Sequence, residues 1–407
     1  MHHTVKTISW IPVIFAHIPD CTSTTVEILV KAWNIYEQRE TNGLSHFLEH
    51  MFFKGGKKWS TPQAVAEAID AFGGECNAYT STEYAWYYVK SAPEFLNQSL
   101  EILADMLVDA QFPKEEMERE KWVIIQELQM YEDNPQRNIW TKQSRRRYGD
   151  NPYWWSILGP EENIRAFTQD QLFTHKQNLY TKDNLVIVVA WRLDNESLIE
   201  EQIATLFWWL PEKKVWWAMP LLHTLPKTKQ EKFIKWTQQT HLLMSAQWFS
   251  LHDEERYAAS LVAQILWWNM SSRLFQRIRE QQWLCYYIGS FHSDNDADGT
   301  FIIKAGMEKA RREQWLASIY EQLDLIAKGD ITPLEHKNAL WHIAWKTQMW
   351  LETSDSVASY LWTQRIFSKK IESLDAELKK YQSVSLEQLQ HVAKKLSSEN
   401  IYAYWIE

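Results

Sequence analysis

The chain has 407 residues, and 52 acidic residues against 43 lysines and arginines give it a formal net charge of −9. Hydrophobic residues make up 45% and charged residues 23%, which is typical of a soluble globular protein and excludes a largely disordered chain. The acidic balance argues against nucleic acid as the main partner, and the absence of an apolar run of about 18 residues argues against a membrane-spanning helix.

The start of the chain and the cysteines indicate the compartment. Residues 1–20 alternate apolar and polar side chains and lack the basic start and unbroken apolar stretch of a signal peptide. The three cysteines, Cys21, Cys76 and Cys285, cannot all pair and have no metal-type spacing, which suits a reducing compartment. We therefore expect a bacterial-type cytoplasmic protein.

Strand and helix patterns alternate along the first half of the chain. Strands are expected at residues 11–18, 24–32, 75–81, 84–91 and 184–190. Helices are expected around His46 and His50 and at residues 61–72, 93–110, 114–131 and 195–206.

The second half restarts the same pattern after a proline-rich segment without clear periodicity, residues 210–230, which is the expected linker. Strands are expected at residues 240–247, 286–291 and 299–305. Helices are expected at 253–266, at a segment ending near 282, and from 308 onward. The recurrence predicts an α+β protein of two homologous domains, residues 1–209 and 231–407.

The segment His46-Phe47-Leu48-Glu49-His50 concentrates residues with metal and acid–base chemistry. On a helix, residues four apart share a face, so both imidazoles can reach one ion. Two neutral imidazoles suit Zn²⁺, which also needs a third ligand and an open position for water. Glu49 adjoins this face, where it can accept a proton from that water. The alternative is a surface helix with two unconnected histidines. Apart from Glu49, the other side chains of this segment are apolar, however, so the face with the histidines is expected to be half-buried, and buried polar groups need a binding partner.

A third ligand must come from elsewhere in the chain. Glu120 and Glu127 are seven residues apart in the expected helix at residues 114–131, which places them two turns apart on one face. Val123, Ile124 and Leu128 are expected on the core side of that helix. Either glutamate alone fits a solvated helix face, whereas the histidine pair favours a metal site.

Three stretches together resemble the inverted-motif zinc peptidases, the family of pitrilysin and the mitochondrial processing peptidase: HFLEHMFFKG, GGECNAYTSTEYAWYYVK and EKWVIIQELQMYEDNP. The family pattern is HxxEH followed by a glutamate roughly 75 residues on. Glu127 follows His50 by 77 residues. The resemblance covers essentially the whole chain, and it implies two sheets that are rich in antiparallel pairs and packed against helices, together forming half of a clamshell.

The resemblance assigns roles to the motif residues. It implies that His46, His50 and Glu127 bind one Zn²⁺, that Glu49 is the general base, and that Glu120 orients a ligand or its water.

Residues of two further segments resemble the family's substrate-binding groups. Asn77 and Ala78 are similar to the edge strand that pairs with a bound peptide backbone. In the stretch SSRLFQRIREQQWLCYYIGS, Arg279 and Tyr286 match an arginine and a tyrosine that hydrogen-bond the substrate carbonyl and the developing oxyanion. From the residues alone, these two are only a helix-end cation and a strand aromatic. The second half has no metal motif, so one zinc site per chain is expected.

The resemblance implies a zinc-dependent endopeptidase that hydrolyses unfolded peptides or presequence-like substrates in an enclosed chamber. Members of this length pair two chains, so we expect a homodimer, or a heterodimer with a sister chain, in which Arg279 and Tyr286 serve the opposite subunit. No nucleic acid or membrane partner is expected. The alternative is a non-catalytic or weakly active scaffold subunit of the same fold.

Tryptophan is unusually frequent in this chain, with 24 residues against 11 glycines, whereas glycine normally makes up about 7% of a protein. Several tryptophans occupy turn-like positions, although tryptophan adopts positive φ only at a cost. Members of the family usually have glycine where this chain has Trp122, Trp191, Trp267, Trp268 and Trp283. Two interpretations stay open: an aromatic-rich protein, or UGA codons that the source organism reads as glycine.

Overall fold

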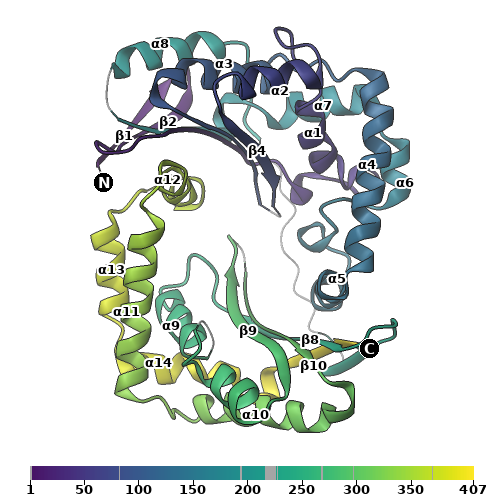
Figure 1. The fold of residues 1–407 in the computed structure, drawn as a ribbon, viewed down its shortest axis with the longest axis vertical. Coiled ribbons are helices and arrows are strands. Elements are labelled where there is room, and N and C mark those ends of the chain that lie inside the picture. The colour runs from purple at the N-terminus through teal and green to yellow at the C-terminus, as the bar shows by residue number, and fades with distance from the viewer. Residues whose placement is uncertain are drawn as a thin grey trace. The chain divides into compact units, whose positions relative to one another are not determined.

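The computed structural model describes residues 2–81, 83–192, 195–215, 226, 228–266, 269–296, 298–368 and 370–407. They form two compact units (Figure 1). The first unit comprises Met1–Met130, Asp150–Leu222 and Trp350–Ile371, and the second comprises Tyr131–Gly149, His223–Met349 and Glu372–Glu407. Each unit contains one sheet and its own apolar core, which confirms the expected α+β class.

The first unit is built on a six-stranded sheet in the order β1-β2-β6-β3-β5-β4. Its strands are β1 (His2–Ile8), β2 (Ile11–His17), β3 (Thr24–Val30), β4 (Glu75–Thr80), β5 (Ala85–Ser91) and β6 (Leu185–Trp191). Neighbouring strands are antiparallel except β2 and β6, which run parallel. Strands β3 and β6 are buried along their whole length, which requires cover on both faces of the sheet.

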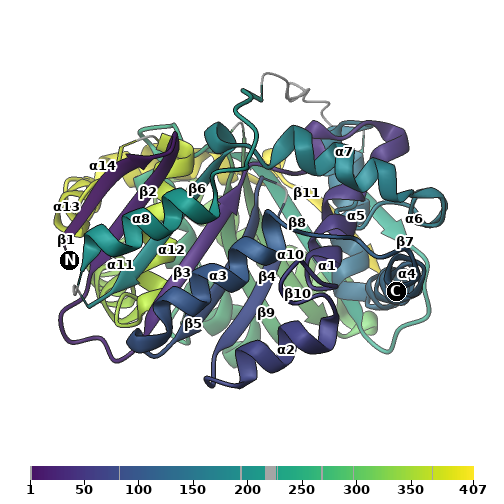
Figure 2. The same cartoon turned by 90° about the horizontal axis from the view of Figure 1, so that it is seen from above.

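Helices from the first half of the chain cover one face of this sheet (Figure 2). They are α1 (Leu44–Phe52), α2 (Pro62–Asp70), α3 (Leu96–Leu107), α4 (Lys114–Asp133), α6 (Glu161–Ala166), α7 (Gln169–Leu179) and α8 (Glu196–Leu206). Helix α3 packs on β3 and β5 because Leu96, Leu100, Leu103 and Leu107 recur on one helical face. Helix α1 packs against β4 and α7, which fixes it beside the sheet edge.

The other face of the first sheet is covered by a helix from near the end of the chain, α12 (Ser354–Ser368). Val357, Ala358 and Leu361 of α12 join a buried cluster with Ile14 of β2 and Val188 of β6. Figure 1 shows α12 beneath the first sheet, where it contacts β3, β6 and β2.

The second unit has a five-stranded sheet in the order β7-β11-β8-β10-β9. Its strands are β7 (Gln230–Phe233), β8 (Thr240–Trp248), β9 (Cys285–Asp294), β10 (Gly299–Met307) and β11 (Tyr402–Ile406). One face carries α9 (Arg256–Leu266), α10 (Arg312–Ala327) and α14 (Leu386–Ala393), and the unit also contains α11 (Pro333–Trp350) and α13 (Leu374–Gln382). Helix α5 (Pro135–Tyr148) packs on β8 and β11, where Ile139 meets Leu243 and Tyr404.

The two sheets share one topology. In each, a parallel pair (β2 and β6, or β7 and β11) is followed by three antiparallel neighbours (β3, β5 and β4, or β8, β10 and β9). The first sheet adds only the edge strand β1. This equivalence agrees with the repeated unit that the sequence predicts.

The compact units differ from the predicted division into residues 1–209 and 231–407. Residues 131–149 belong to the second unit and residues 350–371 to the first, because α5 and α12 each cover a sheet made mostly by the other half of the chain. Of the predicted linker 210–230, residues 216–225 and 227 lie outside the described part of the chain. The strands β1, β7 and β11 and the helices α5, α6, α7, α11, α12, α13 and α14 were not predicted.

All three cysteines carry free thiols. Among the described helices, none combines the length and apolar character needed to cross a membrane.

Candidate active site

Helix α1 carries the predicted ligands, and its first turn is tightly held. Gly43 precedes the helix with φ +96°, and a Cβ there would lie 2.4 Å from the carbonyl oxygen of Leu158, so that only glycine fits. The buried carboxylate of Glu37 accepts hydrogen bonds from the backbone N–H groups of Gly43 (3.0 Å) and Ser45 (2.8 Å). A carboxylate at a helix N-terminus satisfies free N–H groups and the helix dipole.

The structure brings His46, His50 and Glu127 together. One ligand atom from each lies within 4.8 Å of the other two. Glu127 Oε2 lies 3.7 Å from His46 Nε2 and 3.5 Å from His50 Nε2. Ligand atoms in a tetrahedral zinc site, with bonds of about 2.0–2.1 Å, are roughly 3.3 Å apart. These donor types and separations therefore fit Zn²⁺.

Glu120 lies beside this cluster and contacts His50. Its Oε1 is 2.8 Å from His50 Nδ1, and its Oε2 accepts from Lys54 Nζ at 2.6 Å. Burial opposes ionisation of Glu120, but the hydrogen bonds with His50 and Lys54 outweigh it and lower the pKa of the carboxyl group. Because Nδ1 of His50 is engaged in this way, its Nε2 is left for a metal.

The histidines differ in their environments. Burial lowers the pKa of His46 to about 4, so its ring is neutral at pH 7, as a metal ligand must be. Burial also opposes protonation of His50, but hydrogen bonds with Glu120 and Glu127 raise its pKa to about 9 in the metal-free chain. Metal binding at His50 therefore displaces a proton.

Glu49, the predicted base, is half-buried next to the ligand cluster. Burial raises the pKa of its carboxyl group above the ordinary value, and a hydrogen bond from the Thr80 hydroxyl to Oε2 opposes that rise. A carboxylate with a raised pKa is better matched to proton transfer near neutral pH. Sequence reasoning missed Thr80, because a threonine at a strand end has no pattern that connects it to a helix.

Strand β4 places Asn77 and Ala78 at the edge of the first sheet. Among the described strands, β4 pairs only with β5, where Asn77 faces Tyr88 and Ala78 faces Tyr87. The side chain of Asn77 is exposed and that of Ala78 is half-buried. The strand therefore has backbone groups on its outer edge that can accept another extended chain.

Comparison with known proteins decides the family. The family model described as insulinase (peptidase family M16) matches residues 12–161, and the model of the peptidase M16 inactive domain matches residues 166–343. A Bacillus subtilis protein named uncharacterized zinc protease YmxG is 30% identical over 388 residues, covering 95% of this chain and 94% of that protein. The chain belongs to peptidase family M16.

Other members of family M16 agree with this result. A probable mitochondrial-processing peptidase subunit beta from Arabidopsis thaliana is 35% identical over 185 residues, covering 46% of this chain and 34% of that protein. The fold matches a crystal structure from Pseudomonas fluorescens, titled as a peptidase M16 inactive domain, with a TM-score of 0.91. The match has 18% identity and covers 100% of this chain and 98% of that one.

Arg279 and Tyr286 lie in the region matched by the second M16 model. Arg279 belongs to the π-helix Phe275–Gln281, and Tyr286 lies on β9 with 75% of its surface exposed. The guanidinium group of Arg311 holds the intervening turn, since it donates to the carbonyl oxygens of Gln282 (3.1 Å) and Trp283 (3.2 Å). The second unit thus presents an exposed tyrosine next to an anchored turn.

Two exposed tryptophans adopt backbone conformations that favour glycine. Trp283 lies two residues after the end of the π-helix, has φ +54° and is 81% exposed. Ser9 (φ +48°) and Trp10 (φ +73°) form the two-residue turn between β1 and β2, and such a turn with two positive φ angles strongly prefers glycine at its second position. Trp267 and Trp268, which the resemblance in the sequence also singled out, lie outside the described residues.

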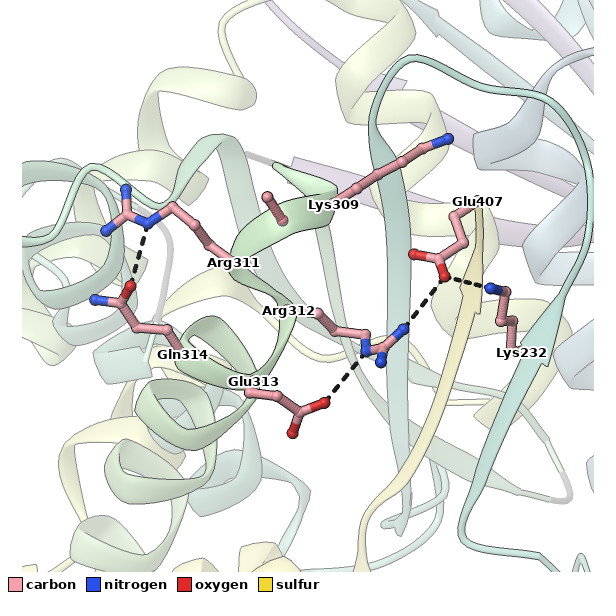
Figure 3. A pocket seen from close by; sticks show the side chains of 8 residues that line it. Lys232, Lys309, Arg311, Arg312, Glu313, Gln314 and Glu407 are labelled. Atoms are coloured by element: carbon pink, nitrogen blue, oxygen red, sulfur yellow. Dashed lines mark hydrogen bonds and ion pairs between the residues drawn. The ribbon is translucent and has the colours of Figure 1, made fainter.

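A hollow of about 810 Å³ in the second unit contains none of the predicted site residues. Its lining includes four basic and two acidic side chains. Lys232 and Arg312 both pair with Glu407, Arg312 also contacts Glu313, and Arg311 donates to Gln314 (Figure 3). The positive charges of Lys232 and Arg312 are therefore balanced within the hollow, but basic side chains outnumber acidic ones in its lining.

Proposed function

We propose that the chain is a zinc-dependent endopeptidase. The observation that carries this proposal is the convergence of His46, His50 and Glu127, with Glu49 on the same helix as the two histidines. This donor set leaves room for a water molecule, which is the arrangement that catalytic zinc sites require.

The residues of the site have distinct roles in this proposal. Zn²⁺ at His46, His50 and Glu127 would lower the pKa of a bound water and polarise a peptide carbonyl. Glu49 accepts the proton of the attacking water at its carboxylate and returns it to the departing amine. A peptide laid along the outer edge of β4 is held by backbone hydrogen bonds beside Asn77 and Ala78.

The test is cleavage of a quenched fluorescent peptide of about twenty residues, rich in basic side chains, since a protein of net charge −9 attracts basic peptides. The expected result is cleavage that a chelator abolishes and added zinc restores. Cleavage that persists after complete removal of the metal contradicts the proposal.

The finer assignments belong to the same proposal. The substrates are unfolded or presequence-like peptides that enter an enclosed chamber, and the working unit is a cytoplasmic homodimer or a heterodimer with a sister chain. In that assembly Arg279 and Tyr286 of one subunit hydrogen-bond the substrate carbonyl bound to the other. Mixing an Arg279→Ala chain with a Glu49→Gln chain tests this: recovered cleavage supports the exchange, and a monomer in light scattering with full activity contradicts it.

A weakly active chain is the second candidate, and one observation favours it. Trp283 has a large exposed side chain in the segment that joins Arg279 to Tyr286. If one zinc binds per chain but cleavage is absent, restoration of cleavage by Trp283→Gly identifies this side chain as the obstacle.

A further inference from the structure

Lys54 lies just beyond helix α1, in a fixed position relative to His50. The chain keeps a helical course past the last residue of α1, since Phe53 N–H donates to the carbonyl oxygen of His50 (3.3 Å) and Lys54 N–H to that of Met51 (3.1 Å). Lys54 is therefore four residues after His50 on the same side of the chain. Its side chain is only 20% exposed, so it is held within the site.

One carboxylate connects these two residues. Glu120 uses Oε1 for His50 Nδ1 (2.8 Å) and Oε2 for Lys54 Nζ (2.6 Å), and its side chain is 6% exposed. A carboxylate that is bound at both oxygens cannot rotate about its terminal bond without breaking a charge-assisted hydrogen bond. Lys54 thus determines which way Glu120 presents its other oxygen.

His46 has no equivalent support. Among the described residues, Nδ1 of His46 is buried and has no hydrogen-bond partner. The pair formed by Glu120 and Lys54 is therefore the arrangement that orients an imidazole in this cluster, and it acts on His50. The summed formal charge of the site is −2, from the carboxylates of Glu49, Glu120 and Glu127 and the ammonium group of Lys54. A divalent cation balances this charge.

We propose that Lys54 is a positioning residue that acts through Glu120. It holds the carboxylate so that Oε1 engages Nδ1 of His50 and Nε2 of His50 points toward Glu127. This inference rests on the proposed zinc site, but it concerns a residue that binds neither metal nor substrate.

The experiment measures zinc affinity by competition with a chromophoric chelator, together with peptide cleavage. Lys54→Met is expected to weaken zinc binding about 10-fold, within the range of about 10- to 100-fold for residues that support metal ligands. Lys54→Arg, which keeps the charge and donors, is expected to stay within about threefold of the wild type. Lys58→Met is the matched control, because Lys58 makes an ion pair of the same length with exposed Glu101.

A double mutant separates action through Glu120 from general destabilisation. If Lys54 acts through Glu120, adding Lys54→Met to Glu120→Gln causes little further loss of zinc affinity, whereas independent effects multiply. Should Lys54→Met fail to fold, Lys54→Gln gives the same comparison without the charge.

The outcomes are distinguishable from those of the proposed function. A wild-type chain that binds no zinc overturns both proposals. A wild-type chain that binds zinc and cleaves, with Lys54→Met unchanged in affinity or multiplicative with Glu120→Gln, overturns only the role of Lys54.

Discussion

The hydroxyl group of Thr80 donates a hydrogen bond to Oε2 of Glu49, and so it joins the last residue of the edge strand β4 to the predicted base on α1. Thr80 is 6% exposed, which shields this contact from water. A peptide that pairs with β4 would therefore lie along the same strand that positions the carboxylate.

Removing the hydroxyl of Thr80 should slow cleavage without removing the metal. We expect Thr80→Val to lower kcat roughly 10-fold, the equivalent of about 1.4 kcal/mol for one hydrogen bond to a charged group. Thr80→Ser should keep most of the activity because it keeps the donor. Steady-state kinetics with zinc analysis checks this, and equal activities of the valine and serine variants would show that the contact has no catalytic importance.

Substitution of Glu49 should separate metal binding from catalysis. Glu49→Gln keeps the shape of the side chain but cannot accept a proton, so we expect one zinc per chain and a loss of about 10²–10⁴-fold in kcat. Elemental analysis and peptide cleavage measure the two properties. Substantial activity in this variant rules out Glu49 as the base.

Glycine should stabilise the chain at the two left-handed tryptophans. For a residue with a Cβ the left-handed conformation costs about 1–2 kcal/mol. Glycine avoids this cost but loses about 0.5–1 kcal/mol through backbone entropy. Trp10→Gly and Trp283→Gly should therefore each raise the free energy of unfolding by up to about 1 kcal/mol. Trp209 is similarly exposed (80%) without positive φ, so Trp209→Gly should lower it. Urea denaturation measures all three, and a loss of stability at residues 10 and 283 contradicts this account.

The same geometry bears on the genetic code of the source organism. If its UGA codons are read as glycine, the chain purified from that organism should have an intact mass well below 48.5 kDa. Peptide mass spectrometry should then find glycine at residues 10 and 283. Tryptophan at both positions would establish the aromatic-rich alternative.

Acid should destabilise the metal-free chain through His175. Its ring is buried and lies 2.8 Å from the Ser45 hydroxyl, and burial lowers its pKa from 6.5 to about 4. The unfolded state therefore binds more protons in this interval, so stability falls as pH falls from about 6.5 to about 4, by on the order of 3 kcal/mol.

His175→Gln removes this titration and should flatten the pH dependence. Both chains are denatured with urea in the presence of a chelator, so that both are free of metal. His46, whose pKa is shifted in the same direction, then contributes equally to the pH dependence of each chain. An unchanged slope between pH 6.5 and 4 in the variant would mean that His175 does not titrate as its burial indicates.

Local patterns predicted the central elements well. The apolar runs of β3 and β6, the periodicity of α3 and the four-residue spacing of His46 and His50 are properties of short segments, so they can be recognised without tertiary information. Lys54 could also have been identified from the sequence, since it follows His50 by four residues.

Features that depend on distant contacts could not be predicted. Val123 was expected on the core side of α4 but is 50% exposed, whereas Ile125 is buried, because the position of the sheet decides which stripe of a helix is covered. The carboxylate of Glu37 serves the N-terminus of α1 from outside the helix, and no spacing rule identifies such a cap.

The placement of α5 and α12 determines the order in which the chain can mature during synthesis. The ribosome has made all strands of the first sheet by Trp191, yet one face of that sheet stays open until residues 354–368 emerge. The nascent chain therefore exposes apolar strands while nearly the whole second half is translated, which favours chaperone binding and aggregation. For the same reason, neither residues 1–209 nor residues 231–407 should be stable when expressed alone.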